Sequence, residues 1–276
     1  MNPRHEIFSL DHAHPNYERW QRAIDAATLR GELVVTILEK QFSLRDKRIL
    51  DVGCGVGGTS HALRRTGAIV TSIDRNPARI GYARQANAAT SAIAADATRL
   101  PFPEHYFDLI ILQDVIEHVS ERDALLRELA RVLTPKGALY LTTPNRLSCI
   151  NIIADPHWGL PLVSLLPRNA VRFVLHTFLR REKDRTDFAE LLSFDKLQTL
   201  LDINIGGVSL KQRIVVEELF TNPSHVVWSN LHRYAISILN NLRLTTIVRR
   251  IVNDRDGFFN RYVAPGWYCI CEKRAV

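Results

Sequence analysis

Apolar and polar positions along residues 48–143 follow two alternating patterns. Short apolar runs predict buried strands at 48–52, 68–74, 91–95, 107–112 and 138–143. Between these runs, apolar residues at helical spacing predict helices at 59–65, 77–88 and 122–133. Strands and helices in alternation are typical of an α/β domain with a parallel sheet. Because the carboxyl ends of parallel strands share one edge of the sheet, a ligand is expected at that edge.

Helical patterns also flank this region. Apolar residues recur at helical spacing across residues 17–42, and we expect Gly31 to separate two helices there. An insertion is expected at 148–185, with a basic amphipathic part at 168–181. The remaining elements expected are a helix at 193–203, a strand at 206–216, helices at 226–242 and 245–252, and a strand at 266–273.

Composition is that of a globular protein, with 46% hydrophobic and 24% charged residues in a chain of 276. The sequence has no run of about 18 apolar residues that would predict a membrane-spanning helix. Residues 1–10 lack the apolar stretch of a secretory signal. The four cysteines and the N-terminal histidines match no metal-ligand spacing, so we expect no metal and reduced thiols. These features favour a cytoplasmic protein.

The formal charge of +7 is concentrated in the second half of the chain. Residues 1–150 hold 19 basic and 17 acidic side chains, whereas residues 151–276 hold 17 and 12. A basic surface can meet nucleic acid, anionic lipid or a phosphorylated substrate. A solvated basic face without a partner is the alternative interpretation.

A glycine-rich turn joins the first predicted strand to the first helix. It reads Asp51-Val52-Gly53-Cys54-Gly55-Val56-Gly57-Gly58, a D-x-G-x-G-x-G pattern. Glycines at such a junction permit positive φ angles and let a ligand approach the backbone. The Asp51 carboxylate would repel a pyrophosphate, which disfavours an NAD dehydrogenase, and it suits a cofactor with an ammonium or sulfonium group. A tight structural turn without a ligand is the alternative.

Acidic residues end three successive predicted strands. Asp51 precedes the glycine turn, Asp74 ends the second strand, and Asp96 follows the third. Asp74 comes about twenty residues after the turn, a spacing that places a carboxylate where it can accept ribose hydroxyls. Asp96 by itself could be only a turn cap. Three acids at three neighbouring strand ends favour a nucleotide-like ligand.

The glycine turn resembles motif I of the class I S-adenosylmethionine-dependent methyltransferases, and it is similar to their quinone-biosynthesis and small-molecule branch. The resemblance continues through Asp96–Phe102, the Gln113–Val119 segment, and the R-V-L-T-P-K-G-x-L run at 131–139, and it covers residues 49–145. It implies a Rossmann-like fold: a mostly parallel seven-stranded sheet with an antiparallel last strand, helices on both faces, and helical cap insertions. It also implies S-adenosylmethionine as cofactor and S-adenosylhomocysteine as product.

The resemblance implies a set of cofactor-binding residues, and together with the insertions found beyond residue 145, where the resemblance thins, it suggests a domain plan. The plan is an N-terminal helical lid at 1–46, a cofactor-binding core at 47–146, a cap insertion at 147–192, and a C-terminal part of the core at 193–276 with a helical insertion at about 220–262. The implied cofactor-binding residues are Asp51, Gly53, Cys54, Gly55, Gly57, Asp74, Arg75, Asp96, Ala97 and Gln113.

His118 is the candidate catalytic residue, because the resemblance puts it near the transferred methyl group, where it would act as a base or shape the pocket. His157 and His225, from the insertions, are further candidates for the base, and a packing role for His118 is the alternative. On a helix, Glu117 and His118 would point about 100° apart, so we do not expect them to pair.

Two motifs are missing after the fourth predicted strand, and their absence limits the classes of methyl acceptor that we expect. No Asn/Asp-Pro-Pro-Tyr/Phe motif follows it, as a flipped nucleic-acid base would require, and no Pro-Cys nucleophile follows it either. We therefore expect methyl transfer to oxygen on a small molecule, sugar or lipid-linked acceptor. RNA methylation through the basic second half, and cofactor binding without turnover, are the alternatives. The basic part of the cap could rest on the inner face of a membrane, or pack on the domain.

Overall fold

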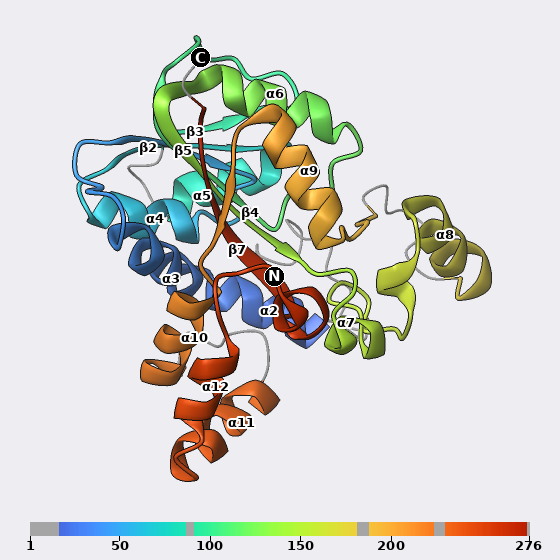
Figure 1. Ribbon diagram of the computed structural model, residues 1–276. Helices are drawn as coiled ribbons and strands as arrows, with labels where there is room; N and C mark the ends of the chain where they lie inside the picture. The colour runs from blue at the N-terminus through green and yellow to red at the C-terminus, as the bar shows by residue number, and fades with distance from the viewer. Residues whose placement is uncertain (1–16, 87–90, 181–187, 224–229, 275–276) are drawn as a thin grey trace.

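The computed structural model describes residues 17–86, 91–180, 188–223 and 230–274 (Figure 1). At its centre lies one sheet of seven strands. The strands are β1 (Arg48–Val52), β2 (Ile69–Asp74), β3 (Ser91–Ala94), β4 (Phe107–Gln113), β5 (Leu133–Pro144), β6 (Val208–Leu210) and β7 (Gly266–Glu272). Their order across the sheet is β3-β2-β1-β4-β5-β7-β6.

The first five strands are parallel, and β7 lies antiparallel between β5 and β6. This confirms the expected Rossmann-like sheet with an antiparallel last strand. The strand order reverses at β1, which pairs with β2 on one side and β4 on the other. In open α/β sheets, the crevice at the carboxyl ends of such a pair is where ligands bind.

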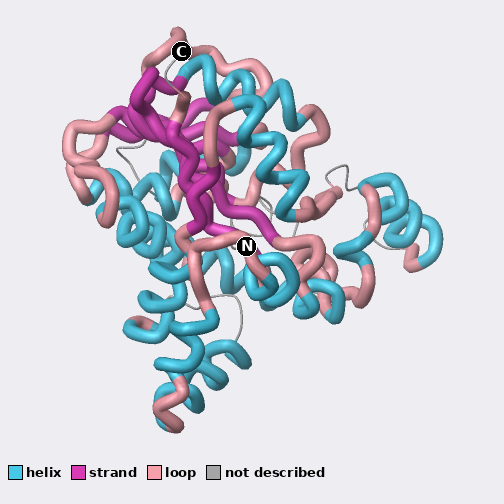
Figure 2. Tube along the Cα trace, viewed as in Figure 1, coloured by secondary structure: helices cyan, strands magenta, loops and turns pink. Residues whose placement is uncertain are grey.

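Helices cover both faces of the sheet, as Figures 1 and 2 show. The helices before the cap are α2 (Tyr17–Asp25), α3 (Ala27–Glu39), α4 (Gly58–Arg65), α5 (Pro77–Ala86) and α6 (Arg122–Val132). The cap contains α7 (Cys149–Ile153), a 3-10 turn at Val163–Leu165, α8 (Arg168–Phe173) and a π-helical turn at Val174–Phe178. The rest are α9 (Phe194–Asn204), α10 (Gln212–Thr221), α11 (Asn230–Asn241), α12 (Thr245–Ile251) and a π-helical turn at Phe259–Val263.

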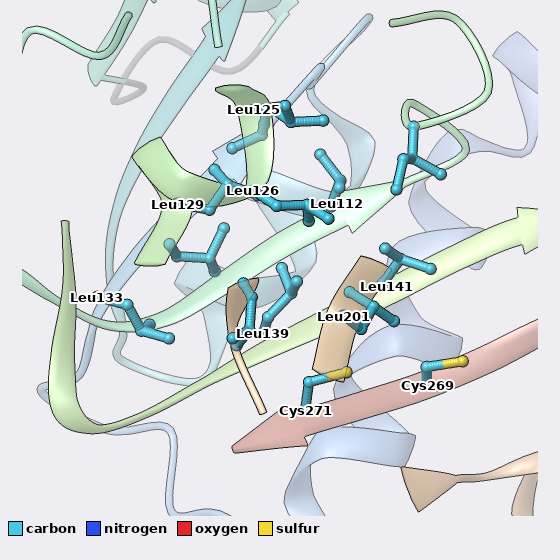
Figure 3. Close-up of a cluster of buried hydrophobic side chains, with 14 of the residues drawn as sticks. Leu112, Leu125, Leu126, Leu129, Leu133, Leu139, Leu141, Leu201, Cys269 and Cys271 are labelled. Carbon is cyan, nitrogen blue, oxygen red and sulfur yellow. The ribbon is translucent and has the colours of Figure 1, made fainter. Parts of the chain in front are cut away.

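Two hydrophobic layers hold these helices, one on each face of the sheet. In β1, Leu50 packs in the layer beneath α6 and α9, whereas its neighbour Ile49 packs in the layer beneath α3, α4 and α10. Side chains of β4 divide in the same way, since successive residues of a strand point to opposite faces. Figure 3 shows the first layer, where leucines of α6 meet β4, β5 and β7. Burial on both faces explains the continuous apolar runs in the sequence.

The expected helix break at Gly31 is wrong. The break lies at Ala26, between α2 and α3, and Gly31 is buried within α3. A Cβ on Gly31 would stand 2.7 Å from the Cα of Thr59 in α4. The glycine therefore serves close packing of two helices, a tertiary requirement that looks like a helix breaker in the sequence.

The expected strand at 206–216 is also wrong over most of its length. Only Val208–Leu210 forms β6, and α10 begins at Gln212. Val215 and Leu219, four residues apart on α10, pack into the layer with α3. A short apolar run is compatible with both strand and helix periodicity, and packing against α3 favours the helix here.

Two other expectations are met within the described residues. Asn76 caps α5, because its Oδ1 accepts a bond of 2.9 Å from the backbone N–H of Ala78. All four cysteines are free thiols. The ends of the helices predicted at 77–88 and 226–242, and the candidate His225, lie outside the described residues. None of the described helices is both long and apolar enough to cross a bilayer.

Candidate active site

The glycine turn follows β1 and is tied to β2 by its backbone. The N–H groups of Gly53 and Cys54 donate to the carbonyl of Ile73 at 2.8 and 2.9 Å. Gly53, Gly55 and Gly57 all have positive φ, at 71°, 54° and 79°. A side chain other than glycine would be strained at each of these positions.

The glycines differ in what surrounds them. A Cβ on Gly53 would stand 2.4 Å from Val115, so this glycine is needed for packing. A Cβ on Gly55 would meet no atom within 4 Å. The turn therefore leaves open space at Gly55, where a ligand can lie directly against the backbone.

Asp74 ends β2 beside this open space. Its Oδ2 accepts a bond of 3.1 Å from the Gly55 N–H, and its Oδ1 accepts one of 2.8 Å from the Asn76 N–H. Arg79 lies 3.8 Å from the same carboxylate. Each carboxylate oxygen has further acceptor capacity, so Asp74 can also receive hydroxyl hydrogens from a ligand.

Asp51 lies beneath the turn and is buried. Its carboxylate accepts a bond of 2.5 Å from the Ser60 hydroxyl, and the hydroxyls of Ser60 and Ser72 lie 2.7 Å apart. Burial raises the pKa of Asp51 to about 6, although the bond from Ser60 opposes the shift. Cys54 is buried against Ile80, and burial raises the pKa of its thiol above the usual range. Thus the structure places both side chains behind the turn.

The segment after β3 is on the surface. Asp96 is exposed, and its Oδ1 accepts bonds of 2.8 Å from both the N–H and the hydroxyl of Thr98. These bonds lower the pKa of Asp96. Ala97 is half-buried and Arg75 is exposed. Asp51, Asp74 and Asp96 accordingly lie at or just after the carboxyl ends of three adjacent strands, β1, β2 and β3, at one edge of the sheet.

The end of β4 is held from two directions. The Gln113 Oε1 accepts a bond of 2.9 Å from the Thr59 hydroxyl at the start of α4. The next residue, Asp114, has a φ of 54° and accepts bonds from Thr142 at 2.9 Å and from Arg30 at 2.5 Å. Arg30 belongs to α3, so the N-terminal helices reach the carboxyl end of the sheet.

The N-terminal helix α3 lies close to α4 because two glycines face each other there. A Cβ on Gly58 would stand 2.3 Å from the backbone of Ala27, and one on Gly31 would stand 2.7 Å from Thr59. The turn, α4 and α3 are therefore packed backbone to backbone next to the open space at Gly55.

A cluster of Glu117, His118 and His157 follows β4. One ligand atom from each of the three side chains lies within 4.8 Å of the others. Glu117 is fully buried, with its Oε2 bonded to the Thr143 hydroxyl at 3.0 Å and its Oε1 3.9 Å from His157 Nε2. The rings of His118 and His157 meet edge to face, with centroids 5.0 Å apart. Glu117 and His118 lie in a turn and not on a helix, so the helical geometry from which we expected them not to pair is wrong, and their ligand atoms come within 4.8 Å of each other.

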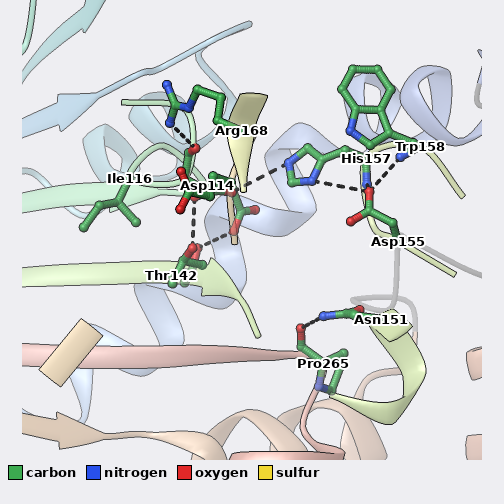
Figure 4. A network of polar contacts seen from close by, with 12 residues as sticks. Asp114, Ile116, Thr142, Asn151, Asp155, His157, Trp158, Arg168 and Pro265 are labelled. Carbon is green, nitrogen blue, oxygen red and sulfur yellow. Dashed lines mark hydrogen bonds and ion pairs between the residues drawn. The ribbon is translucent and has the colours of Figure 1, made fainter. Parts of the chain in front are cut away.

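The cap insertion supplies and holds part of this cluster (Figure 4). Asp155 accepts bonds from the N–H groups of His157 and Trp158 at 2.8 and 3.0 Å, which form the turn that presents His157. The Arg168 guanidinium, at the start of α8, donates to the carbonyls of Glu117, His118 and Val119 at 3.0 to 3.1 Å. The cap therefore fixes the backbone of the turn after β4.

Burial dominates the electrostatics of this cluster. It raises the pKa of Glu117 to about 7, even though attraction to His118 opposes the shift. A carboxyl that titrates near neutrality beside two imidazoles can exchange protons with a bound hydroxyl. The same three side chains carry the donor atoms that a divalent cation binds. Sequence spacing did not reveal the set, since His157 comes from the cap.

The sheet order, the glycine turn and the acidic strand ends are together those of a class I methyltransferase fold, with a candidate cofactor edge at β1, β2 and β4. The family model of the methyltransferase domain matches residues 50–141. The chain therefore contains a methyltransferase domain, a class of domain that uses S-adenosylmethionine as cofactor.

Curated relatives include ubiquinone biosynthesis O-methyltransferases. The protein from Coxiella burnetii is 34% identical over 113 residues, which cover 40% of this chain and 48% of the relative. The protein from Pseudomonas fluorescens is 31% identical over 135 residues, covering 46% and 58%. The matches thus span only about half the length of these relatives.

Solved structures share the fold. An S-adenosylmethionine-dependent methyltransferase from Mesorhizobium loti has a TM-score of 0.56 at 15% identity, covering 91% of this chain and all of that one. A methyltransferase from Methanosarcina mazei has a TM-score of 0.52 at 19% identity, covering 87% and 98%. These matches reach beyond residues 50–141, so the flanking elements belong to the same architecture.

The residues present fit S-adenosylmethionine. The open space at Gly55 admits a ligand against the backbone, and Asp74 beside it offers acceptor capacity to a ribose. The acids Asp51 and Asp74 give this edge a negative potential, which suits a cationic cofactor and not a pyrophosphate.

Proposed function

We propose that this protein transfers a methyl group from S-adenosylmethionine to an oxygen atom of a small or lipid-linked acceptor. The observation that carries the proposal is the adjacency of two features at the end of β4. Gln113 is bonded to the start of α4, beside the glycine turn, and Glu117 begins the cluster with His118 and His157 only four residues later. A proton-accepting group thus stands next to the cofactor edge.

The cofactor, when bound, supplies a methyl group on a positively charged sulfur. An acceptor hydroxyl that takes up this methyl group would have to give up its proton to the protein. We assign that proton to His118, and the Glu117 carboxylate nearby stabilises the imidazolium that forms. The chain's other contribution is to hold the two reactants in line, through the lid, the glycine turn and the cap.

The acceptor class is proposed from the relatives and from the cap. The curated relatives are O-methyltransferases of ubiquinone biosynthesis, so an intermediate of that kind is the first acceptor to test. The cap is apolar inside: Trp158, which follows His157, and Phe188 are buried in its hydrophobic cluster with ring centroids 6.0 Å apart. Such a cap favours a hydrophobic acceptor over a small, very polar one.

A peripheral membrane contact of the cap, predicted from its basic amphipathic segment, stays a prediction. Phe173 and Phe178 are exposed on α8 and the π-helical turn after it, next to the exposed Arg172 and Arg180. Exposed aromatic side chains flanked by arginines are compatible with an anionic bilayer surface.

Calorimetric titration tests the cofactor first. S-adenosylmethionine and S-adenosylhomocysteine should bind with a dissociation constant near micromolar, about −8 kcal/mol, and Gly55→Val should abolish both. NAD should not bind. Binding of NAD alone would remove the methyltransferase assignment of the site.

Transfer of a radiolabelled methyl group then tests the acceptor. The acceptors are an isoprenoid-substituted phenol, a sugar and tRNA, with product analysis by mass spectrometry to locate the methylated atom. His118→Ala should lower kcat by about a hundredfold at unchanged cofactor affinity. Labelling of tRNA that falls steeply with salt would favour the RNA alternative. Cofactor binding without label on any acceptor would favour a binding protein.

A further inference from the structure

The helical insertion between β6 and β7 forms a separate lobe at the lower edge of the molecule in Figure 1. Its inner helix, α10, is anchored in the core through Val215 and Leu219. Its outer helices, α11 and α12, both contact α10. Asn240 on α11 donates to the carbonyl of Phe220 at 3.4 Å, which joins α11 to the end of α10. The lobe therefore has an inner side fixed by packing and an outer side that faces solvent.

The outer side is apolar at helical spacing. Ile238 and Leu242 are four residues apart, as are Ile247 and Ile251. Leu242 is 61% exposed, and Ile247 and Ile251 are each 53% exposed. α12 has no buried residue among those described. Four large aliphatic side chains, one on α11, one in the turn after it and two on α12, are therefore exposed to water at a free-energy cost.

The same lobe is positively charged, because Arg243, Arg249 and Arg250 are exposed on it. At 100° per residue around α12, Arg250 lies beside Ile247, whereas Arg249 lies on the opposite face of the helix. The sequence from Leu219 to Asn253 contains no aspartate or glutamate, so nothing acidic within this stretch neutralises them. The acids that follow are already engaged: Asp254 accepts from the N–H of Arg213 at 2.8 Å, and Asp256 pairs with Arg261 at 2.5 Å.

We propose that the α11–α12 lobe, which exposes the aliphatic residues Ile238, Leu242, Ile247 and Ile251 and the arginines Arg243, Arg249 and Arg250, docks on an anionic lipid surface. Aliphatic side chains enter the boundary between headgroups and acyl chains, while the arginines reach the lipid phosphates. Nucleic acid offers phosphates but no apolar phase for four aliphatic side chains, so the combination favours lipid. This contact is separate from the cap, which lies at another part of the molecule (Figure 1).

Co-sedimentation with vesicles tests the charged part of this surface. The whole protein is mixed with vesicles of phosphatidylcholine alone, or of phosphatidylcholine and phosphatidylglycerol at about 3:1, at moderate salt. We expect binding to the anionic vesicles only. The triple variant Arg243→Gln, Arg249→Gln, Arg250→Gln should bind about a hundredfold more weakly, since each basic residue near an anionic surface contributes roughly a fivefold factor.

Matched controls distinguish the contribution of this surface from the effect of the net charge of the protein. The triple variant Arg45→Gln, Arg127→Gln, Lys136→Gln removes the same charge from exposed positions outside the lobe and should bind like wild type. The apolar part is tested by Leu242→Ser with Ile251→Ser, which should lower binding at least tenfold. Its control is Ile69→Ser with Ile203→Ser, which alters two equally exposed isoleucines elsewhere and should leave binding unchanged. Thermal unfolding verifies that every variant folds.

Four results would overturn the proposal. They are equal loss in both charge variants, full binding by both lobe variants, equal binding to the uncharged vesicles, and absence of any vesicle binding. Loss of a dimer in the lobe variants, seen by light scattering in the absence of vesicles, would instead assign the surface to a second copy of the chain.

Discussion

The guanidinium of Arg30 lies 2.5 Å from Oδ2 of Asp114, and this contact joins the N-terminal helix α3 to the residue that follows β4. The two residues are 84 positions apart in the chain. Asp114 is held in a left-handed conformation by this bond and by the bond from Thr142. The pair therefore links α3, in the N-terminal segment proposed as a lid, to the point where cofactor and acceptor are proposed to meet.

Arg30→Ala should weaken cofactor retention far more than folding. Both side chains are partly exposed, so loss of the pair should cost no more than about 1 kcal/mol of unfolding free energy. The lid should nevertheless open more often, and the dissociation rate of S-adenosylhomocysteine should rise several-fold in stopped-flow measurements. Arg65→Ala is the control, because it removes another exposed ion pair of α3, the pair between Glu32 of α3 and Arg65 of α4. Equal dissociation rates of S-adenosylhomocysteine in the two variants would show that Arg30 does not hold the proposed lid closed.

Gly55→Ala should mainly impair cofactor binding, whereas Gly58→Ala should mainly impair the packing of α3 against α4. At Gly55 a methyl group meets no neighbour, so the cost in unfolding free energy should be only the strain of positive φ, about 1–2 kcal/mol. Cofactor binding should be lost, because the methyl group occupies the space that the ligand needs. At Gly58 a methyl group would clash with the Ala27 backbone and displace α3. Denaturant unfolding and calorimetry on both variants measure this. Stronger destabilisation by Gly55→Ala than by Gly58→Ala would contradict it.

Asp74→Ala should reduce affinity for S-adenosylmethionine by roughly 1–3 kcal/mol, because it removes charged hydrogen bonds to the ribose. It also removes the acceptor of the Gly55 and Asn76 N–H groups, so some loss of stability is expected. Calorimetry at a temperature well below unfolding separates the two effects. Asp123→Ala, which changes an exposed acid of α6, is the control. Unchanged affinity in Asp74→Ala would remove the ribose assignment.

Glu117→Gln should lower kcat by about ten- to a hundredfold at unchanged cofactor affinity, because it removes the negative charge beside His118. Glu190→Gln, a half-buried acid outside the cluster, should behave like wild type. Dialysis against EDTA then distinguishes two chemistries. Activity that survives chelation supports proton transfer, and activity that returns only with added Mn²⁺ or Mg²⁺ assigns the cluster as a cation site.

The raised pKa of Glu117 predicts how stability depends on pH. The folded protein holds this proton up to about pH 7, whereas the unfolded chain releases it near pH 4.5. Between these values the folded state binds more protons, so the contribution of Glu117 to stability falls as pH rises from 4.5 to 7 and is constant above. Asp51 acts in the same direction up to about pH 6.

Glu117→Gln should therefore be more stable than wild type above pH 7, and its advantage should shrink toward pH 5. Urea unfolding from pH 5 to 8 measures the difference. A variant less stable than wild type at pH 8 would show that the carboxylate is stabilised by its neighbours in the fold.

The alternation of apolar runs and helical stretches determined the parallel part of the sheet, since strands buried on both faces must be apolar throughout. The glycine turn and the acids Asp51, Asp74 and Asp96 could be identified as candidate site residues from the sequence, because they lie within or just after those strands. Positive φ at Gly53, Gly55 and Gly57 follows from the same local pattern. These features depend on neighbours along the chain, which the sequence displays directly.

Only the tertiary structure decided which residues meet across the fold. Gly31 looks like a helix breaker but permits α3 to lie against α4, and Val215 belongs to a helix because α3 packs there. His157 reaches Glu117 because Asp155 and Arg168 position the cap against the turn after β4. Contacts of this kind join residues far apart in sequence, and their energies depend on packing and burial, which no local pattern records.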